Sequence, residues 1–473
     1  MLFNSYAFAI FFALLLPTYW LMSRWPRAQN VLLLAVSYYF YSRWDARFLA
    51  LLVVSTLMDY ACGLWVAGEK GPRRRKAAVA LSMALNLGML GYFKYYDFFA
   101  DSLQTALAQA GFSVSMWHLK LALPIGISFY TFQSMSYVID VYRREIQPTR
   151  NLVQFAAFVS FFPHLVAGPI MRPTTLLPQV AGPRRFDLER FYQGSYLIFW
   201  GLLKKVVVAD NLGVIVKDLF GRWETLDGGL ALLAVYAFAF QIYGDFSGYT
   251  DIARGVSKCL GFELSLNFNL PYFAASPREF WTRWHISLSQ WLRDYLYISL
   301  GGSRGGTLLT YRNLMITMIL GGLWHGAAWT YVLWGVYHGL LLVGHRIVEP
   351  LLKRIDPADA VERACWKGLR IIATFHMICL GWLLFRAQSV TQALGMLDAI
   401  VHHPSIPTAA YLLPFLVVVV PLLVVQLILY LADDLDIVAR TPWFVRSAFY
   451  TAGFYAIVLG GNFGGQQFIY FQF

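Results

Sequence analysis

Charged residues are scarce in this sequence of 473 residues. Asp, Glu, Lys and Arg make up only 14% of it, whereas about a quarter of a soluble domain is charged. Hydrophobic residues make up 58%, and the mean hydropathy is +0.53. This composition excludes an ordinary soluble domain. It predicts an all-α, polytopic membrane protein, because spanning helices satisfy their own backbone hydrogen bonds within the bilayer.

Paired cysteines and other metal-binding patterns are also missing. The four cysteines lie far apart and include no C-x-x-C pair, so neither a zinc site nor a redox motif is indicated. The sequence also contains no H-x-x-x-H pair with an acidic residue beside it. That arrangement is the pattern of a helical zinc site. We therefore expect no bound metal and no tightly bound cofactor.

The sequence contains no internal repeat, low-complexity segment or soluble domain. Its first 22 residues are apolar and have neither a basic n-region nor a small-residue cleavage site before Arg24, which favours a retained first span. We expect one membrane domain over residues 1–473, with roughly ten to twelve transmembrane helices.

The few charges are mainly basic, and the formal net charge is +12. They fall mostly in short loops between apolar runs, which favours a role in membrane orientation over nucleic-acid binding. The strongest cluster, residues 69–76, is expected in the cytoplasm. A basic inner face would also attract an anionic donor such as a coenzyme A thioester.

Residues 314–344 contain no Asp, Glu, Lys or Arg, and this run exceeds the roughly 20 residues that cross a bilayer. His325 lies within it, and an ionisable side chain in such a run indicates a functional site. Gly321, Gly322 and Gly326 permit irregular backbone, which at membrane depth is tolerated only beside protein or a wet cavity. We therefore expect His325 to face a cavity.

An aromatic pattern precedes this run. Apolar side chains recur at steps of three and four residues, which predicts one face of a single amphipathic helix. These side chains are Trp281, Trp284, Leu288, Trp291 and Tyr295. The same stretch carries several charges, namely Arg278, Glu279, Arg283, Arg293 and Asp294. So many charges exclude a lipid-facing span, and the helix is expected at the interface or within the protein.

Two pieces of the chain resemble the motifs of membrane-bound O-acyltransferases, especially a bacterial branch that acts in alginate O-acetylation. They are RWHISLSQWLRDYLYISLGG (residues 283–302) and LGGLWHGAAWTYVLWGVYHG (residues 320–339). Further similar phrases occur at residues 123–133, 161–170, 244–255 and 381–386. The resemblance implies transmembrane, re-entrant and interfacial helices around a central cavity, with a catalytic core at about residues 230–345.

The resemblance also implies roles for particular residues. His325 corresponds to the family's W-H-G histidine, and an imidazole suits the removal of a proton from an acceptor hydroxyl. His285 corresponds to a position in the family's other motif, which matches residues 283–302 here. Its role stays open between polarising the thioester carbonyl, orienting the acceptor and bracing the core. The residues expected to bind substrate are Asp245, Trp324, Arg283, Trp284 and Asp294.

The assignment of Asp245 has a structural alternative. Asp245 and Asp251 would point about 120° apart on an unbroken helix, so they do not form a carboxylate pair. Asp245 is therefore either a helix cap or the partner of an arginine, or a residue that lines the site. Lys204 and Lys205 are expected to mark a membrane boundary. The remaining histidines considered are expected to be structural or boundary residues, and they are His164, His338, His345 and His376.

The resemblance implies an acetyltransferase in the bacterial inner membrane. It would carry acetyl from a cytoplasmic donor, acetyl-CoA, toward an exported polysaccharide such as alginate or cellulose, working with periplasmic partner proteins. Transfer in one step is simplest, and a histidine-linked intermediate stays open. Two other classes also stay open. One is a transporter or channel, against which the missing repeats weigh. The other is a scaffold for periplasmic enzymes.

Overall fold

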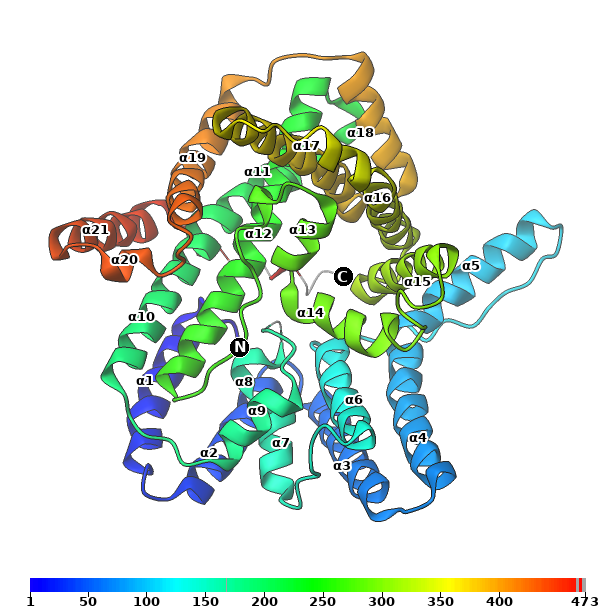
Figure 1. Ribbon diagram of the computed structural model, residues 1–473, viewed down its shortest axis with the longest axis vertical. Coiled ribbons are helices and arrows are strands. Elements are labelled where there is room, and N and C mark those ends of the chain that lie inside the picture. Colours follow the sequence, from blue (N-terminus) through cyan, green and yellow to red (C-terminus); the bar gives the residue numbers. More distant parts are fainter. Residues whose placement is uncertain (167, 465–467, 470–473) are drawn as a thin grey trace. The chain divides into compact units, whose positions relative to one another are not determined.

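The computed structural model describes residues 1–166, 168–464 and 468–469, and every regular element in these ranges is helical (Figure 1). Five of the described helical segments are long and apolar enough to cross a membrane, namely Ala46–Gly68, Pro72–Gln109, Gly228–Cys259, Ala360–Arg386 and Ala409–Ala432. The chain is thus an all-α, multi-pass membrane protein, as predicted. The number of ten to twelve spans stays a prediction.

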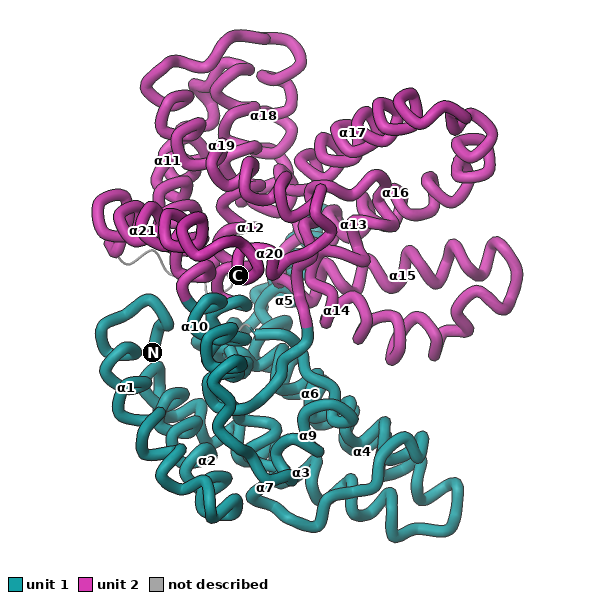
Figure 2. The backbone as a smooth tube through the Cα atoms, turned by 60° about the vertical axis from the view of Figure 1, so that its left-hand side comes forward, with its two compact units in different colours: residues 1–198, 250–265 teal, residues 199–249, 266–473 magenta. Residues whose placement is uncertain are grey.

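The backbone divides into two compact units (Figure 2). Unit 1 comprises Met1–Ile198 and Thr250–Ser265, and unit 2 comprises Phe199–Tyr249 and Leu266–Phe473. Two helices, α10 (Leu188–Leu202) and α12 (Gly228–Cys259), pass from one unit into the other. The single domain over residues 1–473 stays a prediction, as does the extent of its catalytic core.

Unit 1 contains the helices of the N-terminal part of the chain, and α3 packs against α4, α6 and α7 within it. Its other elements are α1 (Tyr6–Leu21), α2 (Pro26–Ser42), α3 (Ala46–Gly68), α4 (Pro72–Leu90), the π-helix η1 (Gly91–Tyr95), α5 (Tyr96–Gln109), α6 (Ile127–Arg143), α7 (Leu152–Ser160), α8 (Phe162–Leu165) and α9 (Pro173–Ala181).

The chain turns at Gly126, directly before α6. Gly126 has a φ of 73°, and a Cβ there would lie 2.7 Å from the carbonyl oxygen of Leu165. Glycine satisfies both the left-handed backbone and the close approach. The helix then begins at Ile127.

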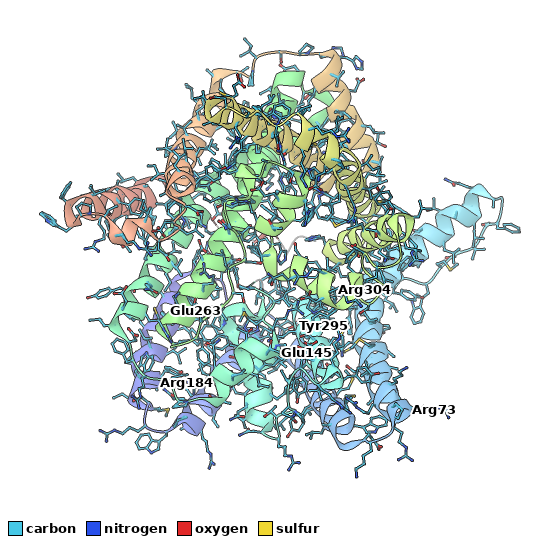
Figure 3. The ribbon with its side chains drawn as sticks, in the orientation of Figure 1. Arg73, Glu145, Arg184, Glu263, Tyr295 and Arg304 are labelled. Carbon is cyan, nitrogen blue, oxygen red and sulfur yellow. The ribbon has the colours of Figure 1, made fainter. Side chains whose placement is uncertain are left out.

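Several buried polar side chains of unit 1 form hydrogen bonds with one another, which lowers the cost of burying them. The carboxylate of Asp59 on α3 accepts from the Ser82 hydroxyl at 2.5 Å and from the Asn86 amide at 2.8 Å, both on α4. The guanidinium of Arg184, labelled in Figure 3, donates to Asn30 Oδ1 on α2 at 2.7 Å. These bonds tie neighbouring helices together through their polar side chains.

Unit 2 contains the two motif regions and the C-terminal helices. Its other elements are η2 (Leu203–Ala209), α11 (Asp210–Gly221), η3 (Trp223–Thr225), η4 (Pro271–Phe273), α13 (Pro277–Arg283), α14 (Ile286–Trp291), η5 (Leu292–Tyr297), α15 (Thr307–His325), α16 (Trp329–Arg354), α17 (Ala360–Arg386), α18 (Val390–His402), α19 (Ala409–Ala432), α20 (Ile437–Arg440) and α21 (Trp443–Gly460). Trp382 of α17 lies in its aromatic core, 4.8 Å between ring centroids from Trp284.

The uncharged run at residues 314–344 is not one span. α15 ends at His325, and three residues follow, of which Gly326 and Ala328 have extended backbone. α16 then begins at Trp329 and packs back against α15. A Cβ added to Gly322 would collide with the carbonyl oxygen of Tyr331, and one added to Gly335 would collide with that of Met318. These two glycines therefore allow two antiparallel helices to touch. The helix breaks at residues 326–328, so the irregular backbone that the sequence permits begins at Gly326.

The aromatic face at residues 281–295 does not lie on one helix either. α13 ends at Arg283, His285 has a left-handed φ of 43°, and α14 begins at Ile286. The prediction of a single amphipathic helix is therefore wrong, because a positive φ interrupts the periodic pattern. Trp284, Leu288 and Trp291 are nevertheless buried, so this segment lies within the protein.

The α15–α16 contact can be tested with two alanine substitutions on α16. Gly335→Ala places a methyl group against the Met318 carbonyl and is expected to lower the free energy of unfolding by about 1–3 kcal/mol. Gly344→Ala is the matched control, because an added Cβ there meets nothing within 4 Å. Thermal unfolding in detergent measures both. Equal shifts of Tm would contradict the packing.

Candidate active site

His325 lies at the C-terminal end of α15, where the chain turns toward α16. Its side chain is 5% exposed, and three aromatic rings contact its ring edge-on. The ring centroids of Trp324 and Trp334 are 5.1 Å away, and that of Phe385 is 5.3 Å away. Such contacts hold an imidazole in one orientation.

A cavity of about 670 Å³ borders His325 within unit 2. Its wall comes from α13, α14, η5, α15 and α16. Several of its side chains are charged or titratable, namely Arg278, Arg293, His325, His345, Arg346 and Glu349. The expectation that His325 faces a cavity is therefore confirmed.

The structure brings His285 next to His325, which the 40-residue spacing alone does not predict. Their ring centroids are 6.5 Å apart. His285 is fully buried in the turn between α13 and α14. The Phe246 ring of α12 contacts it at 4.7 Å, and the Trp324 ring lies 6.0 Å away. The two motif histidines thus form one pair.

Asn267 is a site residue that the sequence analysis missed. Its Oδ1 lies 3.2 Å from His285 Nδ1 and accepts from both the backbone N–H and the hydroxyl of Ser287, at 3.1 and 2.9 Å. Asn267 belongs to the connection after α12, outside both motif pieces. No periodicity or spacing links it to His285, so only the fold reveals the contact.

The expected substrate-binding residues occupy different positions. Trp324 contacts both histidine rings. Arg283 belongs to the framework around the site, where it bonds to Glu279 and to the Asn269 carbonyl. Trp284 packs in the aromatic core against Trp382. Their roles in binding substrate stay predictions.

Asp294 reaches the cavity indirectly. Its carboxylate accepts from the guanidinium of Arg293 at 2.7 Å, and Arg293 lines the wall. Tyr295, labelled in Figure 3, follows it on η5 and contacts Trp291 at 5.1 Å between ring centroids. His345, expected to be structural, also lies on the cavity wall. A role for Asp294 in substrate binding stays a prediction.

Asp245 belongs to a buried cluster of charges instead of the cavity wall. The Lys205 ammonium lies 2.8 Å from Asp245 Oδ1 and 2.7 Å from Asp210 Oδ1. The other oxygen of Asp245 accepts from the backbone N–H of Ile469 at 2.7 Å. Asp245 thus pairs with a basic residue, but this residue is a lysine and not the expected arginine. Lys204 and Lys205, expected to mark a membrane boundary, are both buried.

The residue before Ile469 extends these contacts toward the histidines. Phe468 is buried and packs 4.6 Å from the Tyr249 ring and 6.0 Å from the Phe246 ring, both on α12. Phe246 in turn contacts His285. Among the described residues, no group of three His, Cys, Asp or Glu side chains has the arrangement to hold a metal ion.

Comparison with known proteins identifies a family and several relatives of this sequence. The sequence model of the MBOAT, membrane-bound O-acyltransferase, family matches residues 33–385. A probable alginate O-acetylase AlgI of Azotobacter vinelandii is 45% identical, covering 84% of this chain and 78% of that protein. Its counterpart in Pseudomonas aeruginosa is 43% identical over 84% and 74% of the two chains. A peptidoglycan O-acetyltransferase of Helicobacter pylori is 33% identical over 80% and 74%.

The buried charge cluster generates a stability prediction. Lys205→Met leaves the carboxylates of Asp210 and Asp245 without their shared cation, and we expect a loss of about 3–5 kcal/mol in unfolding free energy. Asp210→Asn is the control, because one ammonium and one carboxylate remain. Thermal unfolding in detergent should show the larger loss for Lys205→Met. Equal losses would contradict a shared cation.

Proposed function

The chain belongs to the membrane-bound O-acyltransferase family, and on that premise we propose that it moves acetyl groups from acetyl-CoA to an exported polysaccharide. Membership makes it an O-acyltransferase that acts in a membrane. The relatives named for O-acetylation of alginate and peptidoglycan support acetyl as the group transferred and a polysaccharide as the acceptor. The bacterial inner membrane is the location where a cytoplasmic donor and an exported polymer are both accessible.

One observation carries this proposal. His325 lies on the wall of a cavity while its ring is next to that of His285. A cavity of about 670 Å³ is in the size range of small-molecule sites, which are about 300–1,000 Å³. A general base has to meet the proton it removes, and this position lets a ligand approach the imidazole.

In the proposed acetyl transfer, His325 is the group that accepts and returns a proton. The imidazole takes the proton of an acceptor hydroxyl while the oxygen attacks the thioester carbonyl carbon. The carbon–sulfur bond then breaks, the coenzyme A thiolate leaves, and the imidazolium returns the proton to that sulfur. This one-step route needs no acyl-enzyme, and the products are the acetyl ester and the free thiol.

The charges of the cavity wall support an anionic donor. Arg278, Arg293 and Arg346 all line the cavity that borders His325. A guanidinium matches phosphate oxygens in both charge and geometry, and coenzyme A carries phosphates. The Asp294 carboxylate holds Arg293 through a 2.7 Å hydrogen bond, which would orient this guanidinium toward a ligand.

We further propose that delivery to the polymer involves other components. The expected partners are periplasmic acetyltransferase proteins, the exopolysaccharide and the surrounding membrane lipid. Trp324 contacts both histidine rings. A substrate that binds beside either ring would therefore also meet this indole. Alginate and cellulose are both compatible acceptors.

Removing the base tests the function. We expect His325→Ala to lower acetyl transfer from labelled acetyl-CoA to an oligosaccharide by about 10²–10⁴-fold, the usual contribution of a general base. His376→Ala is the control, because His376 is an exposed residue of α17 that bonds to Tyr236 and the Ile372 carbonyl. Both proteins are first checked for folding by size-exclusion chromatography.

The same variants discriminate between the alternative functions. Unchanged transfer by folded His325→Ala protein would contradict the catalytic role and favour a scaffold. A transporter would instead accumulate labelled donor inside proteoliposomes without forming acetyl ester. In cells, the catalytic role predicts loss of polymer acetyl at normal protein level and normal polymer export.

A further inference from the structure

The contacts of Asn267 establish which atom of its amide faces His285. That atom lies 3.1 Å from the backbone nitrogen of Ser287, whose N–H is directed at it. A backbone N–H can only donate, so the atom it meets is the carbonyl oxygen, Oδ1, and not the amide nitrogen. The Ser287 hydroxyl donates to the same oxygen at 2.9 Å. The amide orientation therefore follows from a main-chain donor.

This oxygen determines the tautomer of His285. Oδ1 lies 3.2 Å from His285 Nδ1 and has no hydrogen to donate, so Nδ1 carries the proton in the neutral ring. The hydrogen bond made by one ring nitrogen sets the state of the other, which places the lone pair on Nε2. Asn267 thus selects one of the two neutral forms of the imidazole.

The backbone around His285 is held by the same segment. The Ile286 N–H donates to the carbonyl oxygen of Asn267 at 3.0 Å, and the Asn269 N–H donates to that of Arg283 at 2.9 Å. These bonds bracket His285, whose φ of 43° is uncommon for a residue other than glycine. The connection after α12 therefore holds both the main chain and the ring of this histidine.

The tautomer decides between the roles open to His285. A group that stabilises the oxyanion of acyl transfer must donate a hydrogen bond to it. With Nδ1–H directed at Asn267, the neutral ring carries its lone pair on Nε2 and has no second N–H. In this state it does not polarise the thioester carbonyl, so orienting the acceptor and bracing the core are the roles that remain.

We propose that Asn267 is a positioning residue that holds His285 in the Nδ1–H tautomer beside His325, with the lone pair on Nε2. The consequence for acetyl transfer rests on the proposed function, whereas the tautomer does not.

Nitrogen NMR tests the tautomer directly. Protein labelled with ¹⁵N-histidine in detergent is compared with the His285→Gln variant to assign the His285 signals. We expect a protonated Nδ1 and an unprotonated Nε2 in the wild type, and in Asn267→Asp, which keeps an acceptor oxygen. Asn267→Val should show a mixture of tautomers. A protonated Nε2 in the wild type overturns the proposal, and this spectrum decides even where Asn267→Val does not fold.

Kinetics test the positioning role of Asn267. Asn267→Val is expected to lower acetyl transfer to an oligosaccharide by about 10–100-fold, the usual effect of losing a residue that orients a functional histidine. Asn267→Asp, which keeps the acceptor oxygen, should restore both the Nδ1–H signal and transfer. Wild-type transfer by Asn267→Val protein that shows mixed tautomers would contradict the proposal.

Two comparisons complete the design. Asn211→Val is the matched control, because its amide belongs to the same unit and bonds to the carbonyl oxygens of Val207 and Gly460. It should alter neither the His285 signals nor transfer. Should the wild type transfer no acetyl and yet show the Nδ1–H tautomer, the proposed function fails while the positioning role of Asn267 stands.

Discussion

The backbone contact between α15 and α16 is the constraint on which the candidate site depends. Gly322 and Gly335 let the two helices approach so closely that an added Cβ would meet a carbonyl oxygen of the opposite helix. Small residues of this kind are what allow helices to touch in membranes. Because the helices touch, a turn of three residues joins them, and His325 ends α15 among the rings of Trp334 and Phe385.

Buried hydrogen bonds complete the arrangement that the helix contact begins. The turn at His285 separates α13 from α14. The backbone groups on either side of it, the carbonyl of Arg283 and the N–H of Ile286, form hydrogen bonds with the segment that contains Asn267. The ion pairs of Lys205 hold Asp245, which in turn holds the backbone of Ile469. A polar group is costly to bury alone, so each of these bonds favours one arrangement of the side chains around the site.

Composition and motif sequence predicted the class of fold and the exposure of His325 to a cavity. Those properties depend on local apolar patterning and on the cost of an ionisable group in an apolar run. The break at His285 was missed because Trp281, Trp284 and Leu288 fit a helical period. The left-handed backbone that interrupts this period is held by Asn267, a tertiary contact that no periodic pattern records. The lysine partner of Asp245 was missed for the same reason.

The central claim is that His285 and His325, 6.5 Å apart, act on one substrate as a unit. A double-mutant cycle of acetyl transfer by His285→Ala, His325→Ala and the double variant tests this claim most directly. Residues that act as a unit lose rate non-additively. The account predicts that the double variant is no slower than His325→Ala alone. Rate losses that multiply would show that the two histidines act independently and would contradict it.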